Sequence, residues 1–324
     1  VWSVGDHGGM TIVEVHNDSP RAFAVAFSGR GLLTDRPVSD VPPQGIDLPD
    51  DAIVLPVGHR TSVRVGFAAG ESDRATGALP PVADPAAVVR GWTAVTGRAG
   101  RFELPDERLV HEVTAARSDL LLDGPVDPAT DPAGFVFDVA QLARLGEPAA
   151  EWLPDVVGPI ESIARNDSAD AAAALSAAAG LVAAAGDSLA TADLGRLLGR
   201  RGDDPAAPRA GFAELERGDS AGRFAHDVEA LLVAGGVLLA RGFATPWLGA
   251  ELAVHGLPTA PRSTVSFAVR WHGARPAVLW EQHGPPVTLT APAVDPQWSS
   301  GAPSGEALWA EPPKRTPLRL TPES

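Results

Sequence analysis

Acidic residues beside tryptophans are the first candidates for chemistry in this sequence. Glu151 precedes Trp152, and Glu281 follows Trp280. Hydrolysis of a glycosidic bond needs two carboxylates, roughly 5–9.5 Å apart, and aromatic rings pack on the apolar faces of sugars. We therefore take Glu151 and Glu281 as candidate catalytic carboxylates, and Trp152 and Trp280 as candidate substrate-binding residues. The alternative is a first-turn helix charge at Glu151 and a solvated strand-end charge at Glu281.

A second group of functional side chains lies at residues 270–275. Arg270 and Arg275 could donate paired hydrogen bonds to a ligand, and Trp271 could stack on a sugar. His272 adds a further polar group to this candidate substrate-binding set. The same pattern also fits a structural hairpin whose arginines and histidine bind neighbouring loops, and this alternative stays open.

Other catalytic patterns are absent or have a structural explanation. The chain has no cysteine, and its 8 histidines lack metal-ligand spacing, so we expect neither a metal nor another cofactor. Residues 218–222 match the GxSxG pattern of hydrolase nucleophiles. That motif requires a buried strand before the serine, whereas residues 213–217 are charged. We therefore expect Asp219 or Ser220 to cap a helix.

Composition excludes several functional classes. The net charge is −15, and basic residues form only short runs, so we expect no nucleic-acid partner. No segment has the roughly 20 apolar residues that span a bilayer, so we expect no membrane partner. The first residues lack the basic start and apolar core of a signal peptide. We therefore expect a cytoplasmic protein.

Short strands are predicted for residues 1–83. Val63, Val65 and Phe67 alternate with smaller or polar residues, which is typical of a half-buried strand. Clusters of turn residues separate this segment from its neighbours. Several short antiparallel strands separated by turns favour a β-sandwich. We expect strands at 11–16, 21–28, 52–57 and 60–67.

Residues 84–256 change to an Ala-rich helical pattern. Apolar residues recur at helical period, and Asp84 and Asp131 stand at cap positions, each followed by proline. Short connections predict antiparallel helical hairpins. We expect about seven helices, starting near residues 84, 104, 131, 151, 171, 187 and 219, with the last reaching 241 after an interruption at 235–236.

Residues 257–324 return to strands. Val265, Phe267, Val269 and Trp271 share one face of a strand, and residues 277–281 return after a turn. Trp298 and Trp309 farther along are expected to dock the end of the chain. The sequence thus predicts an α+β fold in three segments, 1–83, 84–256 and 257–324.

Three phrases carry a family resemblance. Residues 265–281 (VSFAVRWHGARPAVLWE) resemble the closing β-segment of bacterial glycoside-hydrolase-like proteins of the glucoamylase and glycogen-debranching type. Residues 104–125 (LPDERLVHEVTAARSDLLLDGP) and 131–152 (DPAGFVFDVAQLARLGEPAAEW) are similar to helices and loops of their toroid. The resemblance implies an N-terminal antiparallel β-sandwich, a partial (α/α) toroid of helical hairpins and a C-terminal β-segment. The predicted helices are fewer than a complete toroid has, which implies a truncated ring.

The resemblance implies a carbohydrate-related protein. Because no motif here matches the paired catalytic carboxylates of that family, we expect a catalytically degenerate form that binds glycans. Two alternatives stay open: an active glycosidase that uses a carboxylate pair on an α-glucan or oligosaccharide, and a non-catalytic scaffold for a protein partner. Fold alone does not decide among them, since function depends on the site. A second copy of the chain or a partner subunit could supply the missing helices.

Overall fold

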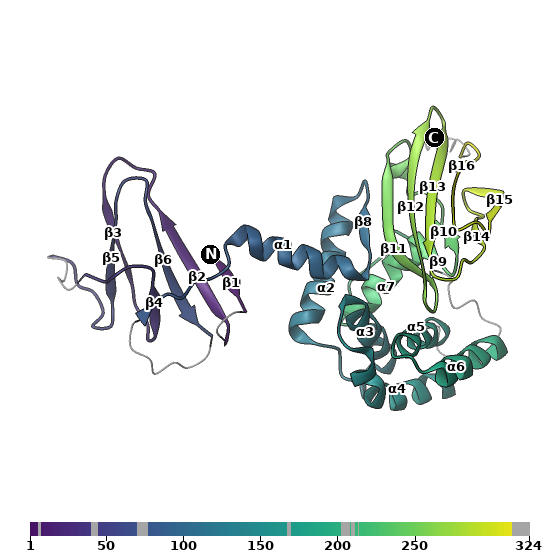
Figure 1. Cartoon of the computed structure of the whole chain (residues 1–324), viewed down its shortest axis with the longest axis horizontal. Coiled ribbons are helices and arrows are strands. Elements are labelled where there is room, and N and C mark those ends of the chain that lie inside the picture. The colour runs from purple at the N-terminus through teal and green to yellow at the C-terminus, as the bar shows by residue number, and fades with distance from the viewer. Residues whose placement is uncertain are drawn as a thin grey trace, which may run out of the picture. The chain divides into compact units, whose positions relative to one another are not determined.

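In the computed structural model of the chain, the described residues are 1–5, 8–39, 45–69, 77–166, 170–201, 208, 211–212 and 214–312. The chain forms two compact units, Val1–Gly91 (unit 1) and Trp92–Ser324 (unit 2). Their described parts contain both helices and sheets, which confirms the predicted α+β class (Figure 1).

Unit 1 contains two sheets. The larger has the strand order β1-β2-β6-β4-β7, and the smaller pairs β3 with β5. Its pairs are antiparallel except β4 with β7. The strands are β1 (Trp2–Val4), β2 (Met10–His16), β3 (Phe23–Phe27), β4 (Leu32–Thr34), β5 (Ile53–Val57), β6 (Ser62–Ala68) and β7 (Gly77–Ala78).

The core of unit 1 follows from strand alternation. Val63 and Val65 of β6 are buried with Leu55 and Val57 of β5 and Leu32 of β4, so both sheets contribute to one cluster. Because side chains alternate between the faces of a strand, the residues between these valines point to the opposite face of the larger sheet.

Seven α-helices occur in the described part of the chain, and each begins near a predicted helix start. Helix α1 starts in unit 1 and ends in unit 2. The helices are α1 (Pro85–Thr96), α2 (Glu107–Asp123), α3 (Pro132–Leu145), α4 (Leu153–Arg165), α5 (Ala171–Ala184), α6 (Ser188–Arg201) and α7 (Ala221–Leu232).

Local chemistry explains where these helices begin. Asp106, Asp131 and Ser220 each accept a hydrogen bond from a backbone N–H in the first turn of α2, α3 and α7. Such caps satisfy donors that the helix itself leaves unpaired. The expectation that Asp219 or Ser220 caps a helix is confirmed, with Ser220 in that position.

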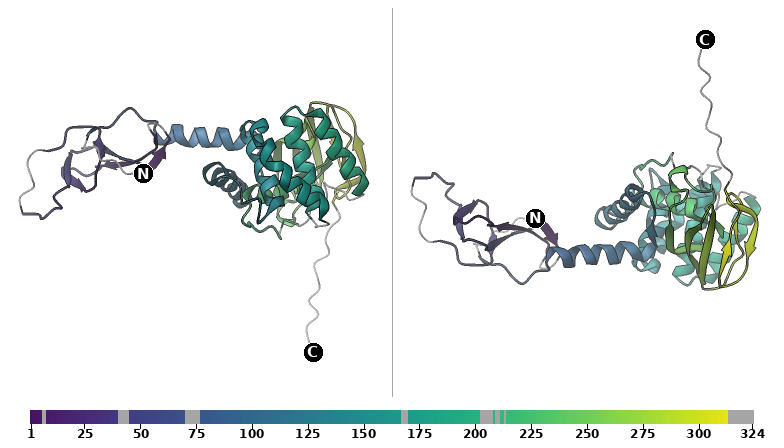
Figure 2. Two further views of the ribbon diagram at one scale, coloured as in Figure 1. Left: turned by 90° about the horizontal axis from the view of Figure 1, so that it is seen from below. Right: turned by 90° about the horizontal axis from the view of Figure 1, so that it is seen from above.

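Small residues let the helices of unit 2 pack closely. Helix α5 buries Ala171, Ala174 and Ala178 against α3 and its neighbours. Gly222 of α7 lies so near α3 that a Cβ there would be 2.6 Å from the Asp138 Cα. Helices α3–α6 lie on one side of unit 2 and the strands on the other (Figures 1 and 2).

The last predicted helix was too long. Helix α7 ends at Leu232, and Val233–Ala234 (β9) and Val237–Leu238 (β10) instead form an antiparallel pair. Gly235 and Gly236 connect them with φ of 54° and 94°. This backbone conformation suits glycine and cannot continue a right-handed helix, so the prediction for residues 233–241 was wrong.

Two sheets complete unit 2. One has the order β16-β13-β12-β11-β8, and the other has the order β15-β14-β10-β9. The strands not yet defined are β8 (Arg101–Glu103), β11 (Leu252–Ala260), β12 (Ser263–His272), β13 (Arg275–His283), β14 (Leu289–Ala291), β15 (Asp295–Ser300) and β16 (Ser304–Leu308).

Helices and strands of unit 2 share a hydrophobic core. Val113 of α2, Val228 of α7 and Phe267 of β12 belong to the same buried cluster. The helical residues of 84–256 and the strands of 257–324, which the sequence pattern separates, are therefore packed together. Trp309 is 0% exposed and contacts Trp298 edge-on, so both act as the expected docking residues.

Across the described residues, the helices are too short or too polar to cross a bilayer.

Candidate functional site

The two predicted catalytic carboxylates lie in different parts of unit 2. Glu151 belongs to the short 3₁₀-helix η3 (Ala149–Trp152) among the helices, whereas Glu281 belongs to β13. Both side chains are exposed, and Glu281 has the His283 imidazole at 3.8 Å. The structure thus places one carboxylate on the helical side and one on the sheet side. Their catalytic role stays a prediction.

The predicted tryptophans have structural partners. The Trp152 indole N–H donates to the Glu147 carboxylate at 2.9 Å. The indole N–H groups of Trp271 and Trp280 donate to the carbonyls of Ala250 and Ala302. Trp280 is buried, while Trp152 and Trp271 are partly exposed. These contacts hold loops in place, and they leave part of two indole rings open to solvent.

The group at residues 270–275 forms the tip of the β12–β13 hairpin. His272 lies opposite Arg275 in the strand register. Arg275 donates from Nε to the Trp309 carbonyl at 2.9 Å and from Nη2 to the Leu308 carbonyl at 3.0 Å. Arg270 and His272 are exposed. Arg275 therefore holds the end of β16, as the structural alternative for this hairpin proposed, and the binding role of the group is untested.

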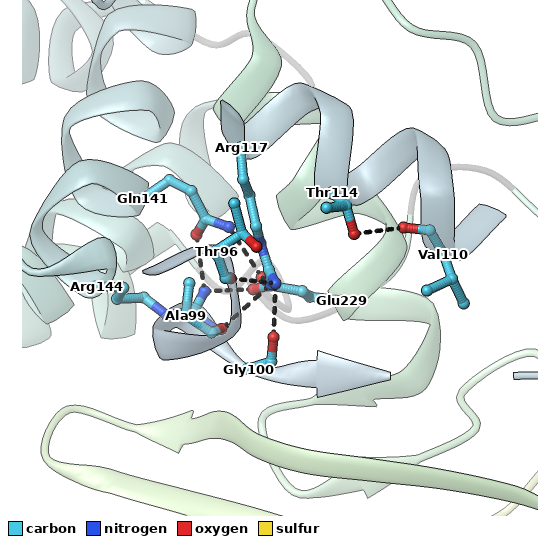
Figure 3. Close-up of polar contacts among 9 residues, drawn as sticks. All are labelled: Thr96, Ala99, Gly100, Val110, Thr114, Arg117, Gln141, Arg144 and Glu229. Atoms are coloured by element: carbon cyan, nitrogen blue, oxygen red, sulfur yellow. Dashed lines mark hydrogen bonds and ion pairs between the residues drawn. The ribbon is translucent and has the colours of Figure 1, made fainter. Parts of the chain in front are cut away.

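Glu229 of α7 is a buried carboxylate that binds two arginines (Figure 3). It accepts hydrogen bonds from Arg117 at 2.8 Å, from Gln141 at 3.1 Å and from Arg144. Burial pushes the pKa of Glu229 upward, but attraction to Arg144 and Arg117 outweighs it and holds the pKa below its ordinary value.

The centre of this network is buried. The side chains of Glu229 and Arg117 are each only 4% exposed, whereas Arg144 at its edge is 27% exposed. Arg117 also donates to the carbonyls of Thr96 and Gly100, where α1 gives way to the following turn (Figure 3). The network therefore ties the end of α1 to α2, α3 and α7. Because the Glu229 carboxylate is buried and already accepts from three side chains, we assign the network to the scaffold.

Asp138 is a second buried carboxylate, 1% exposed. Its Oδ1 accepts from the Ser220 hydroxyl at 2.8 Å and from the Gly222 N–H at 2.6 Å, and its Oδ2 accepts from the Val126 N–H at 3.0 Å. Burial raises the pKa of Asp138 above its ordinary value, although these hydrogen bonds act in the opposite direction. Asp138 thus anchors the start of α7 on α3.

Beside this anchor, the N-terminal ends of three helices meet at one arginine. Arg223, in the first turn of α7, donates from Nη2 to Asp131 Oδ1 at 2.7 Å. The same Nη2 lies 3.7 Å from Asp170 Oδ2. Asp131 is the residue before α3, and Asp170 is the residue before α5. We refer to Asp131, Asp170 and Arg223 as the helix-end cluster.

The helix-end cluster is partly exposed to solvent. The side chains of Asp131, Asp170 and Arg223 are 34%, 24% and 27% exposed, whereas Glu229 is 4% exposed. The Asp170 side chain makes no capping hydrogen bond to its own helix. The N-terminal ends of helices carry partial positive charge, which stabilises the two carboxylates where they stand.

An aromatic residue flanks the cluster. The Arg223 guanidinium lies 5.8 Å from the centre of the Phe137 ring, which supports it by a cation–π contact. The half-buried His226 packs against the Phe137 ring, with the two ring centroids 4.7 Å apart. The cluster thus combines two carboxylate acceptors, a positioned arginine and an imidazole close by.

No group of three or more possible metal ligands occurs among the residues that the structure describes. In the helix-end cluster, Arg223 neutralises part of the charge of the two carboxylates.

Comparison with known proteins identifies no relative: no family model, curated protein or solved structure matches the chain.

Sequence reasoning missed the helix-end cluster as a site. Asp131 was recognised as the start of a helix, but Arg223 carried no signal of its own. The only signal in the sequence was an acidic residue at the start of more than one predicted helix. Whether these helix starts lie next to each other depends on how the three helices pack, and the sequence pattern does not contain that information.

Proposed function

We propose that this chain is a carbohydrate-related protein that binds a glycan at the helix-end cluster without cleaving it. The observation that carries the proposal is the sharing of Arg223 Nη2 by the Asp131 and Asp170 carboxylates in a partly exposed position. Sugar hydroxyls both donate and accept hydrogen bonds. A site that offers two carboxylates and a fixed guanidinium satisfies both capacities.

The layout supports the same class. Helices α3 and α4 pack together as a hairpin, as do α5 and α6, and α7 packs beside α3. We propose that these helices are a partial (α/α) toroid, that unit 1 is its antiparallel β-sandwich, and that the sheets of unit 2 are its closing β-segment.

The state of the carboxylates favours binding over hydrolysis. A glycosidase needs a protonated carboxyl with a raised pKa in contact with the substrate. Asp138 has a raised pKa, but it is 1% exposed and its oxygens already accept from Ser220, Gly222 and Val126. Asp131 caps α3 and pairs with Arg223, so it serves as an ordered acceptor.

The proposal includes a cytoplasmic location and a possible second copy or partner subunit that completes the ring. An active glycosidase that uses Glu151 and Glu281, with Trp152, Arg270, Trp271, His272, Arg275 and Trp280 around the sugar, is the competing function. It requires sugar release, which the glycan-binding form does not give.

The test is glycan-array binding by the full chain, with sugar release from every bound glycan measured in parallel. We expect binding without release. Arg223→Ala and Asp170→Asn should each weaken binding about ten-fold or more, because a charged hydrogen bond is worth roughly 1.5–3 kcal/mol. Asp170→Asn preserves the helix start, because Asp170 makes no side-chain cap.

A matched control is Arg217→Ala, which removes another half-exposed arginine that pairs with a carboxylate, Asp119. This control should bind as the wild type does. Release of sugar would establish the glycosidase instead. Absence of binding to any glycan would overturn the proposal and leave the protein-binding scaffold.

A further inference from the structure

Unit 1 has a groove of about 450 Å³ on the outer face of its larger sheet. Its floor is polar and comes from Glu14 of β2, Ser62 and Arg64 of β6, and Asp35 just after β4. One wall is residues 79–82, which follow β7. The groove belongs entirely to unit 1 and is separate from the helix-end cluster.

Strand register builds the polar floor. Glu14 and Arg64 are direct cross-strand neighbours, and Arg64 Nε donates to Glu14 Oε1 at 3.2 Å. Asp35 is joined to the same place by its backbone N–H, which donates to the Arg64 carbonyl at 3.1 Å. The inward-facing neighbours, Val63 and Val65, fill the core of unit 1. Alternation therefore fixes which face carries the charges.

Arg64 is held in position by Trp2 and Glu14. Its guanidinium lies 5.6 Å from the centre of the Trp2 ring, a cation–π contact. Its Nε is used by Glu14, and within the described part of the chain its two Nη atoms make no hydrogen bond. A planar guanidinium fixed in this way can offer both Nη groups to a ligand at little entropic cost.

The wall of the groove is also fixed in advance. The Leu79 N–H donates to the Thr34 carbonyl at 2.8 Å, and the Trp2 indole N–H donates to the Ala83 carbonyl at 3.0 Å. Between these anchors lie Pro80 and Pro81, whose rings restrict the backbone. Leu79 packs over Gly66, where an added Cβ would be 2.6 Å from Leu79 Cδ1.

The groove is nearly balanced in charge. Glu14 pairs with Arg64, and Asp35 has Arg36 at 3.5 Å. Two carboxylates in the lining disfavour a phosphate or another polyanion. Hydroxyl groups suit the site, because they can donate to the carboxylates and accept from the Arg64 Nη groups. The prolines and Leu79 supply apolar surface for the C–H face of a sugar ring.

We propose that this groove is a second glycan-binding site, specific for neutral saccharides. The ligand class rests on the proposed function, but the site and its residues are independent of the helix-end cluster.

The test is calorimetric titration of the full chain with the neutral oligosaccharide that gives the strongest array signal. Wild type should show two sites per chain. Arg64→Ala and Glu14→Gln should each remove one site or weaken it about ten-fold or more. Gly66→Ala should do the same by displacing Leu79 and the wall. The control is Arg21→Ala, an exposed arginine of unit 1 outside the groove, which should bind normally.

The outcomes separate this proposal from the proposed function. Loss of one site in Arg64→Ala while Asp170→Asn removes the other supports both. Binding that is unchanged in Arg64→Ala and Glu14→Gln but lost in Asp170→Asn would overturn the groove as a binding site and support the helix-end cluster. Binding that is lost only in the groove variants would support the groove and overturn the helix-end cluster as a binding site. Binding only of anionic glycans, or no binding, overturns the groove proposal.

Discussion

Replacing Glu229 by glutamine tests the buried network that holds the helices of unit 2. The carboxylate is 4% exposed and pairs with Arg117, also 4% exposed, and with Arg144, 27% exposed. Removing one partner of a buried ion pair leaves uncompensated charge and costs roughly 3–5 kcal/mol. Glutamine keeps the shape and one acceptor, but its amide group would face donors. We expect Glu229→Gln to lower the free energy of unfolding by about 3–5 kcal/mol at pH 7.

The pH dependence gives this prediction a second test. The folded-state pKa of Glu229 lies below its ordinary value of 4.5, so the unfolded chain takes up the proton first as the pH falls. The stability from this carboxylate is therefore full above about pH 4.5 and is lost as the pH falls below it through the folded-state pKa. The gap between wild type and Glu229→Gln should accordingly be constant from pH 7 to 5 and shrink below 4.5.

Urea unfolding followed by tryptophan fluorescence measures the effect. Of the 8 tryptophans only Trp2 precedes unit 2, so the signal reports mainly on unit 2. The control is Glu161→Gln, which removes an exposed pair with Arg165. Exposed pairs contribute roughly 0.2–1 kcal/mol at most. A loss below 1 kcal/mol in Glu229→Gln, or a gap that does not change with pH, would refute the assigned role.

Four further substitutions test the titration of Asp138 and the packing of unit 2. Asp138→Asn should show the opposite pH trend, because the raised pKa of Asp138 makes the folded chain keep its proton to a higher pH than the unfolded chain does. The stability of the wild type relative to the variant should therefore fall as the pH rises from 3.8 through the folded-state pKa. Urea midpoints across pH 3.5–7 measure this difference, and a flat or rising difference would contradict the prediction. Gly222→Ala should lower the free energy of unfolding by roughly 1–3 kcal/mol, because its Cβ would be 2.6 Å from the Asp138 Cα and the Phe137 carbonyl oxygen. Its control, Gly195→Ala, lies in a helix with open space around it and should stabilise the protein by up to about 1 kcal/mol. Equal effects of the two variants in thermal unfolding would show that α7 and α3 do not cross closely. Trp309→Ala should lower the free energy of unfolding by about 3–5 kcal/mol, because a fully buried aromatic side chain is lost. A change under about 1 kcal/mol in the same assay would show that Trp309 does not anchor the segment after β16.

Local signals predicted the elements of the fold well. Asp131 and Ser220 accept hydrogen bonds at helix starts, as their residue types and the following pattern indicate. Alternating apolar residues predicted β6 and β12, and turn residues beside apolar or β-branched runs predicted β2 and β13. These features depend on neighbours in sequence, so the sequence pattern contains the information that decides them.

Features that depend on long-range packing were not predictable in this way. Strand β8 is only three residues long and exists because it pairs with β11. The apolar residues after Leu232 favour a helix in the sequence pattern, yet Val237 pairs with Thr290 of β14, far along the chain. For short apolar runs, tertiary pairing overrides helix propensity.

The candidate sites also depend on long-range packing and not on local sequence signals. Glu151 and Glu281 were chosen because each adjoins a tryptophan, but adjacency in sequence does not bring side chains together in a fold. The helix-end cluster combines Asp131, Asp170 and Arg223 from three helices, and the groove of unit 1 combines three strands with the segment after β7. Neither has a local motif, because packing alone assembles it.

Hydrogen–deuterium exchange of the full chain, with and without the array-selected oligosaccharide, tests whether a glycan binds at the helix-end cluster. Binding there should slow exchange in the first turns of α3, α5 and α7, which carry or adjoin Asp131, Asp170 and Arg223. Unchanged exchange in all three turns at a saturating oligosaccharide concentration would rule out this binding site.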